Sequence, residues 1–273
     1  MEHIVGMMWN KNEGDLLTDT IASALENVDT LVIADDGSTD NSWDIIQGFA
    51  AHHKDQIEHI QRAPDKNDKA QRQALLNVIQ QRYRPEDTWV QLIESDIMIM
   101  DTDIRLCLND RANGKVSMRW RLLNATVPHE VEWMDVDTYP NWDKPIQEIM
   151  SHGHILETMT YTFRPFPEVT YTGQTRWRPW PDGLGKYPAS PPQTLNDYKP
   201  LLAHYGYRGP VHFYKKFAKQ GISWHPKYTS WDLTSPESVR KTVSFFNGEW
   251  NSHPFRMDRV SYSHRDKKAH GVG

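Results

Sequence analysis

Apolar segments with strand spacing and helix spacing alternate along the first hundred residues, and this alternation constrains the fold more than any other feature. Short apolar runs predict strands at residues 3–8, 30–34, 57–61 and 89–93. Between them, apolar residues recur at helical spacing and predict helices over residues 16–28, 42–49 and 70–79. Such alternation is typical of right-handed crossovers in a mostly parallel sheet. The sequence therefore predicts an α/β fold with helices on both faces of the sheet, with Asp15 and Asp40 as helix caps.

The composition of the chain changes near residue 120. Only Pro64 and Pro85 of the 17 prolines precede Trp120, and most of the 11 tryptophans follow it. Prolines mark turns and irregular segments, so the following stretch reads mainly as ordered loop. We predict a domain over residues 1–221, divided at 120 into a regular half and an irregular half. Residues 222–273 are predicted to form a helical, basic extension.

Charge and cysteine content narrow the class of protein. The net charge of −5 argues against a general affinity for nucleic acid or anionic lipid. No apolar run approaches the roughly 20 residues of a membrane helix, and the first residues lack the pattern of a secretory signal. Cys107 is the single cysteine, which rules out an internal disulfide and a thiolate metal cluster. We therefore expect a soluble cytoplasmic protein.

Acidic residues follow two of the predicted strands at the point where each strand ends. Asp35 and Asp36 begin the run Asp-Asp-Gly-Ser-Thr-Asp after the second strand, and Glu94-Ser95-Asp96 follows the fourth. Ligands bind at the carboxyl ends of the strands in an open parallel sheet. The sequence therefore predicts that both acidic clusters lie at one ligand-binding edge.

These two clusters, together with Asn12-Glu13 after the first strand, resemble the motifs of the family 2 glycosyltransferases, which have the GT-A fold. The resemblance covers residues 3–105. It implies an enzyme of the hexosyltransferase type (EC 2.4) that moves a sugar from a nucleotide-diphosphate sugar, expected to be UDP-linked, to a hydroxyl acceptor with inversion. The residues after 120 would then be the acceptor half. The acceptor stays open among glycans, small molecules, proteins and modified nucleobases, and so does the oligomeric state.

The resemblance implies donor contacts by Asp35, Asp36, Arg72 and Ser95. The second aspartate of the pair, Asp36, would accept the imide N–H of a uracil. The residues by themselves leave another interpretation open, in which Asp35 and Asp36 form a turn and cap the next helix. Arg72 resembles a basic residue of the family that contacts the diphosphate or the base. A solvated helix face is the alternative for this arginine.

Glu94-Ser95-Asp96 stands where the family has an Asp-x-Asp motif. Hard carboxylate oxygens suit Mn²⁺ or Mg²⁺, so Asp96 is the predicted metal ligand. Glu94 is one methylene longer than the family's aspartate, which leaves a direct metal contact and a ribose or water-mediated contact equally open. His204 resembles a histidine that many GT-A enzymes present as a further metal ligand, and the alternative is an ordinary hydrogen-bonded histidine.

The general base is not marked by a clear motif. An inverting transfer needs a carboxylate that takes the proton of the acceptor hydroxyl. Asp137 and Asp182 lie among aromatic residues after Trp120 and are equal candidates, although either can be a turn residue.

Other functions stay open at this point. One is a binding module that keeps the fold but has lost turnover. A nucleotidyltransferase is disfavoured by the lack of a Gly-rich, basic loop near the amino terminus. A glycosyltransferase acting on modified DNA bases is suggested by a group of basic residues: Arg111, Lys115, Arg119 and Arg121.

Overall fold

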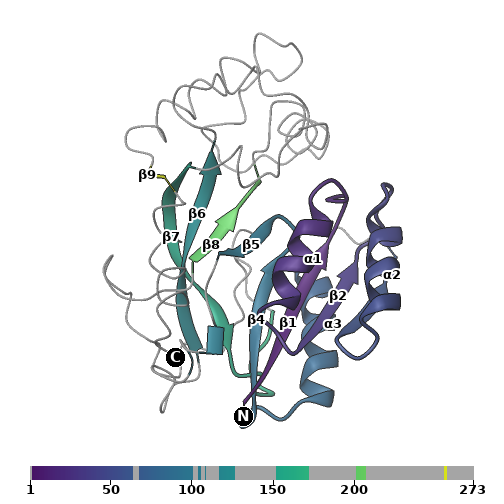
Figure 1. Cartoon of the computed structure of the whole chain (residues 1–273). Coiled ribbons are helices and arrows are strands. Elements are labelled where there is room, and N and C mark those ends of the chain that lie inside the picture. The colour runs from purple at the N-terminus through teal and green to yellow at the C-terminus, as the bar shows by residue number, and fades with distance from the viewer. Residues whose placement is uncertain are drawn as a thin grey trace, which may run out of the picture. The chain divides into compact units, whose positions relative to one another are not determined.

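The computed structural model (Figure 1) describes residues 2–63, 68–100, 104–105, 108, 117–126, 152–171, 201–206 and 255–256. The chain forms two compact units. The first comprises residues 1–122 and 157–202, and the second comprises residues 123–156 and 203–273. Each unit thus joins segments that are distant in the sequence. The contiguous division at residues 120 and 221 stays a prediction.

The first unit begins with alternating strands and helices. In chain order these are β1 (His3–Asn10), α1 (Leu17–Leu25), β2 (Thr30–Asp35), α2 (Ser42–His52), β3 (Ile57–Gln61), α3 (Asp68–Arg82), β4 (Thr88–Glu94) and β5 (Ile97–Met100). The later strands are β6 (Ser117–Thr126), β7 (His152–Phe163), β8 (Leu201–His204) and β9 (Phe255–Arg256). The described strands follow the order β3-β2-β1-β4-β7-β6-β8-β5, and β9 pairs with β7.

Strands β3, β2, β1 and β4 are parallel, as predicted. Every residue of β2 is buried, and β4 is buried up to its last residue. Helices therefore cover both faces, which explains why these strands appear in the sequence as continuous apolar runs. Strand β3 lies at the edge and has a mixed burial pattern. The predicted mostly parallel α/β sheet is thus confirmed.

The order of the strands decides which face each helix covers. The crossovers from β1 to β2 and from β2 to β3 run in one direction along the sheet, whereas the crossover from β3 to β4 runs back. Right-handed crossovers then place α1 and α2 on one face and α3 on the other. Figure 1 shows this arrangement, and α1 contacts α2 while α3 packs against β1 and β2.

An antiparallel strand completes the described core of the first unit. Strand β7 pairs with β4 and sets Phe163 opposite Val90. Beside this pair, the buried Thr162 hydroxyl donates to Gln91 Oε1 at 2.6 Å. The sequence after residue 120 was predicted to be mainly ordered loop, so β6 was not predicted. Its alternation of Met118, Trp120 and Leu122 with arginines is typical of a strand, and the change of composition at residue 120 falls within it.

The helix caps differ in part from the prediction. The N-cap of α1 is Leu16, without a side-chain cap hydrogen bond, so the prediction of Asp15 as the cap is wrong. For α2 the N-cap position is Asn41, but Asp40 Oδ1 accepts the backbone N–H of Ser42 at 3.0 Å. Asp40 therefore satisfies one orphan N–H of α2 from one position before the cap, which agrees with its predicted role.

Within the described part of the chain, we find no helix with the length and apolar character needed to cross a membrane. Of the predicted helical, basic extension over residues 222–273, the structure describes only residues 255–256, which form β9.

Candidate functional site

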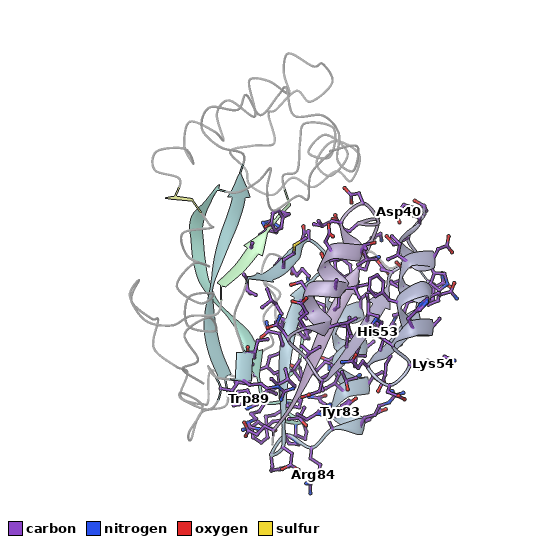
Figure 2. The ribbon with its side chains drawn as sticks, viewed as in Figure 1. Asp40, His53, Lys54, Tyr83, Arg84 and Trp89 are labelled. Carbon is purple, nitrogen blue, oxygen red and sulfur yellow. The ribbon has the colours of Figure 1, made fainter. Side chains whose placement is uncertain are left out.

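The register of the sheet brings the two predicted acidic clusters to one edge. Asn10 of β1 lies opposite Asp35 of β2, and Trp9 of β1 lies opposite Glu94 of β4. All three strands are parallel, so the chain leaves them at the same edge of the sheet. Figure 2 shows Asp40 at this end of the first unit, while Arg84 lies at the opposite end. The edge where the acidic clusters meet is called the donor edge below.

Asp35 holds the loop that follows β2. Its side chain is fully buried, and its Oδ1 accepts the Asn10 side-chain amide at 2.8 Å. Its Oδ2 accepts the backbone N–H of Ser38 at 2.9 Å, which is the turn that the sequence left open as an alternative. Gly37 allows the sharp turn with a φ of 63°, in the left-handed region that glycine tolerates best. The contacts of Asp35 thus organise the loop, and its predicted donor contact stays a prediction.

Asp36 lies between two side chains that the sequence analysis did not select. Lys11 Nζ donates to Asp36 Oδ2 at 2.8 Å, and Gln71 Nε2 donates to Asp36 Oδ1 at 2.6 Å. Asp36 and Gln71 are both 1% exposed. A carboxylate oxygen can accept more than one hydrogen bond, and the contact of Asp36 with a ligand N–H stays a prediction. The only sequence signal for Lys11 was its place beside the Asn12-Glu13 motif.

The two amino-terminal motifs are cross-linked by hydrogen bonds. Asn12 Oδ1 accepts the backbone N–H of Thr39 at 2.7 Å, and the Asn12 N–H donates to Ser38 Oγ at 2.9 Å. The Gly14 N–H donates to Asp40 Oδ2 at 3.0 Å. A Cβ on Gly14 would stand 2.2 Å from Asn41 Oδ1, so a larger residue here would require the Asn41 side chain to shift. Both loops therefore form one structure, which explains why the two motifs occur together.

Arg72 and Glu94 form an ion pair at the end of β4. Arg72 Nη2 donates to Glu94 Oε1 at 2.8 Å. The guanidinium carbon lies 5.2 Å from the centroid of the Trp9 ring, within range of a cation–π interaction. The predicted site residues Arg72 and Glu94 are thus in contact with each other, although the sequence did not predict that they form a pair.

Ser95 and Asp96 are both 5% exposed and are held against α1. The hydroxyl of Thr20 in α1 donates to the Ser95 carbonyl at 2.9 Å. One turn later, the Ser23 hydroxyl lies 3.1 Å from both the carbonyl and the N–H of Ile99 in β5. The end of β4 and the start of β5 are therefore fixed against α1.

The carboxylate oxygens at the donor edge are of the type that a hard divalent cation prefers. Among the described residues no group of three or more His, Cys, Asp or Glu side chains is placed to hold a metal ion. Mg²⁺ in nucleotide sites is commonly held by one or two carboxylates together with substrate phosphates. The buried Asp96 carboxylate fits such a site, whereas Glu94 already accepts a hydrogen bond from Arg72.

The remaining predicted site residues cannot be joined to this edge. His204 ends β8 and belongs to the second unit, where a Cβ on Gly206 would stand 2.4 Å from its Nε2. Its role as a metal ligand stays a prediction. The two candidate bases, Asp137 and Asp182, lie outside the described residues.

Tyr171 is a further residue of this region that the sequence analysis missed. Its side chain is 4% exposed, and its hydroxyl has no hydrogen-bond partner among the described residues. Burial raises the pKa of this hydroxyl far above its ordinary value, while Arg72 lowers it and Glu94 raises it. No motif marks Tyr171, because its chain segment lies far along the sequence.

Two glutamines of α3 hold the segment that carries Tyr171. Gln73 Oε1 accepts the Tyr171 backbone N–H at 2.5 Å. Gln80 Nε2 donates to the carbonyls of Phe166 at 2.7 Å and Val169 at 3.0 Å. Since these contacts are made by side chains of one helix, α3 positions both Arg72 and Tyr171.

Replacing Gln80 with leucine should loosen this segment. The Gln80→Leu change removes the side-chain donor from both carbonyls, although the Phe166 carbonyl still accepts the Val169 N–H, and we expect the free energy of unfolding to fall by about 1–2 kcal/mol. Urea denaturation measures the change. Gln81→Leu, at an exposed position of the same helix, is the matched control and should stay within about 0.5 kcal/mol of the wild type. Equal stability of the Gln80 and Gln81 variants would contradict this role of Gln80.

Several solved structures are similar to this chain at low identity. S. aureus TarS 1–349 shares 16% identity, with 60% of this chain and 47% of that chain covered and a TM-score of 0.40. TarS 1–349 in complex with UDP shares 15% identity, again with 60% of this chain and 47% of that chain covered, and the TM-score is 0.41. The mannosyltransferase PcManGT from Pyrobaculum calidifontis, in complex with GDP-Man and Mn²⁺, shares 13% identity over 89% of this chain and 73% of that chain, with a TM-score of 0.44.

The chain thus spans about half the length of the TarS 1–349 structures that it matches. No curated protein matches the sequence significantly.

One segment of the chain matches a known protein family. The matched segment begins within β1 and extends beyond β5, so it includes Asn12-Glu13, the Asp-Asp-Gly-Ser-Thr-Asp loop and Glu94-Ser95-Asp96. These are the motifs on which the predicted resemblance rests. Residues 7–110 match the family described as glycosyl transferase family 2, and the predicted resemblance is confirmed over this segment.

Proposed function

We propose that this protein is a glycosyltransferase that moves a sugar from a nucleotide-diphosphate sugar to a hydroxyl acceptor. The observation that carries the proposal is the meeting of Asp36, the Arg72–Glu94 pair and Asp96 at one edge of the parallel sheet. A nucleotide sugar needs an acceptor for a base N–H and a way to neutralise its diphosphate. The donor edge offers a carboxylate for the first and a guanidinium for the second. The match over residues 7–110 supports the same activity.

In this proposal Asp36 accepts the base N–H, with UDP-sugars as the first donors to test. Lys11 and Gln71 hold the carboxylate in place, since each donates to one of its oxygens. Asp35 acts indirectly, because its hydrogen bonds shape the loop on which Asp36 lies. Ser95 would then line the donor site through its position between Glu94 and Asp96.

Asp96 would hold a Mn²⁺ or Mg²⁺ ion, while the metal-ligand role of His204 stays a prediction from the sequence. Such an ion neutralises the charge that develops on the departing nucleoside diphosphate. The chain's own contribution is a buried carboxylate held in place by the packing of β5 against α1. A carboxylate in a site with little water interacts more strongly with a cation than one at the surface.

The acceptor reaction is proposed to proceed with inversion. The acceptor hydroxyl oxygen attacks the anomeric carbon, its proton passes to a carboxylate, and the bond to the diphosphate breaks. Asp137 or Asp182 is proposed as that carboxylate. The acceptor itself and the cytoplasmic location stay predictions from the sequence.

A donor panel tests the proposed function. The purified protein is incubated with UDP-, GDP- and other nucleotide sugars, Mn²⁺ and acceptor extracts, and released nucleotide is measured. We expect release of nucleoside diphosphate from at least one donor. Binding of a donor without release by any of them would favour the binding module, and release of pyrophosphate would favour a nucleotidyltransferase. A protein that binds no nucleotide sugar would contradict the proposal.

A further inference from the structure

Four side chains from separate segments of the first unit meet beside the predicted metal ligand. Trp9 lies opposite Glu94 in the register of β1 and β4. Arg72 comes from α3, donates to Glu94 and lies over the Trp9 ring. Tyr171 comes from the segment after β7, and its backbone N–H donates to Gln73 Oε1, next to Arg72 in α3. These four residues are called the Arg72 cluster.

Glu94 is already engaged within this cluster. The side chains of Arg72 and Glu94 are only 13% and 26% exposed, so water screens their attraction weakly. A cation that took Glu94 as a ligand would compete with Arg72 and leave a shielded guanidinium without its partner, which is costly. The extra methylene of glutamate extends its reach toward α3. The residue that replaces the family's first aspartate is therefore suited to orient an arginine.

Two polar groups of the cluster are buried without a partner among the described residues: the Tyr171 hydroxyl and Trp9 Nε1. A buried donor without a partner destabilises the folded state, so folding stability alone does not favour such groups. Trp9 Nε1 and the guanidinium are hydrogen-bond donors, and the Tyr171 hydroxyl can be one. A ligand rich in anionic oxygens is the common partner for these three groups.

We propose that the Arg72 cluster is a preassembled clamp for the diphosphate oxygens of the donor, in which Glu94 orients Arg72 and leaves the metal ion to Asp96. The inference rests on the proposed function, because the diphosphate is that of the nucleotide sugar. Trp9 fixes the plane of the guanidinium by stacking, and Glu94 fixes its direction. The Tyr171 hydroxyl stays protonated and donates to a diphosphate oxygen. Glu94 and Trp9 are positioning residues for Arg72.

Mn²⁺ affinity shows whether Glu94 orients Arg72 or coordinates the metal ion. Electron paramagnetic resonance of Mn²⁺ measures its affinity for the protein saturated with UDP or GDP, whichever binds the wild type more tightly. We expect Glu94→Gln and Glu94→Asp to keep the Mn²⁺ affinity within about 2-fold, and Asp96→Asn to lower it at least roughly 10-fold. Glu94→Asp restores the residue that the family has at this position. If Glu94 were a metal ligand, Glu94→Asp would bind Mn²⁺ as tightly as the wild type or more tightly, whereas Glu94→Gln would bind it more weakly. A loss in Glu94→Gln as large as that in Asp96→Asn would overturn the proposal.

Nucleotide affinity without metal tests the clamp itself. In EDTA, calorimetry should show that Glu94→Gln and Glu94→Asp each bind the nucleoside diphosphate roughly 10-fold more weakly than the wild type, because neither holds Arg72 in place. The affinity for the corresponding monophosphate should change less than about 2-fold. Unchanged diphosphate affinity in both variants would contradict an orienting role.

Tyr171→Phe removes one oxygen atom and is the sharpest variant for the buried hydroxyl. We expect its melting temperature to equal or exceed that of the wild type, since a buried unsatisfied hydroxyl is lost. Diphosphate affinity should fall roughly 10-fold. The matched control is Tyr83→Phe. In the wild type the Tyr83 hydroxyl donates to Glu58 at 3.1 Å, and Figure 2 shows Tyr83 near Arg84, at the end of the unit opposite the donor edge. This variant should leave nucleotide affinity unchanged. Unchanged diphosphate affinity in Tyr171→Phe would overturn the role of this hydroxyl.

Nucleotide binding by the wild-type protein shows whether the proposed function fails or only the clamp. If it binds neither UDP nor GDP at millimolar concentration, the proposed function fails and the clamp fails with it. If it binds a diphosphate and the Glu94 and Tyr171 variants bind equally well, only the clamp is overturned.

Discussion

The Asp96→Asn variant should fold normally and transfer sugar at least about 100-fold more slowly than the wild type, because losing metal stabilisation of a leaving group removes several kcal/mol. The amide has almost the shape of the carboxylate but no negative charge to hold a divalent cation. Asp96 is 5% exposed, so an isosteric change is the appropriate one. Steady-state release of nucleotide from the best donor measures the effect, and thermal melting checks the fold.

The controls for this variant are a second aspartate and a chelator. Asp55→Asn makes the same chemical change at an exposed position in the loop before β3, and it should leave turnover unchanged. EDTA should abolish turnover of the wild type, and added Mn²⁺ should restore it. Full activity of the wild type in EDTA would refute the metal dependence, and normal turnover of Asp96→Asn would refute the assignment of the ligand.

The Asp36→Ala variant should bind the donor nucleotide about 10- to 150-fold more weakly, which corresponds to the loss of a hydrogen bond to a charged group. The change also removes the partner of Lys11 and of the buried Gln71. We therefore expect lower stability as well, since a buried amide and a shielded ammonium lose their acceptor. Calorimetry with the nucleoside diphosphate measures affinity, and urea denaturation measures stability.

Gln71→Leu separates the two effects of the Asp36 change. It removes the amide that holds Asp36 but keeps the carboxylate and its contact with Lys11. We expect stability to fall by about 1 kcal/mol, while affinity falls much less than in Asp36→Ala. If Asp36→Ala lost stability but kept its nucleotide affinity, Asp36 would be a structural residue, and the base would bind elsewhere.

Local patterns in the sequence determined the architecture of the first hundred residues. The apolar runs of β1, β2 and β4 are buried on both faces, and such strands need no long-range information to be recognised. The order of strands and helices then required a mostly parallel sheet, which placed the acidic clusters at one edge. The same local signals failed for the cap of α1, because Leu16 begins this helix without a side-chain bond.

The candidate site was predictable only where its residues lie in motifs. Asp36 and Asp96 follow strands directly, so their position along the chain fixes their position in space. Lys11 and Gln71 carry no such signal, because each meets Asp36 across a separation in sequence that no periodicity records.

The tertiary structure alone decided how the charged groups at the donor edge are paired. The sequence showed that Asp36, Arg72 and Glu94 belong to one edge, since the ends of parallel strands converge there. It did not show that Glu94 accepts from Arg72 or that Asp36 accepts from Lys11. Those pairings depend on the register of β1 with β4 and on the packing of α3, because hydrogen bonds are set by distances of a few tenths of an ångström.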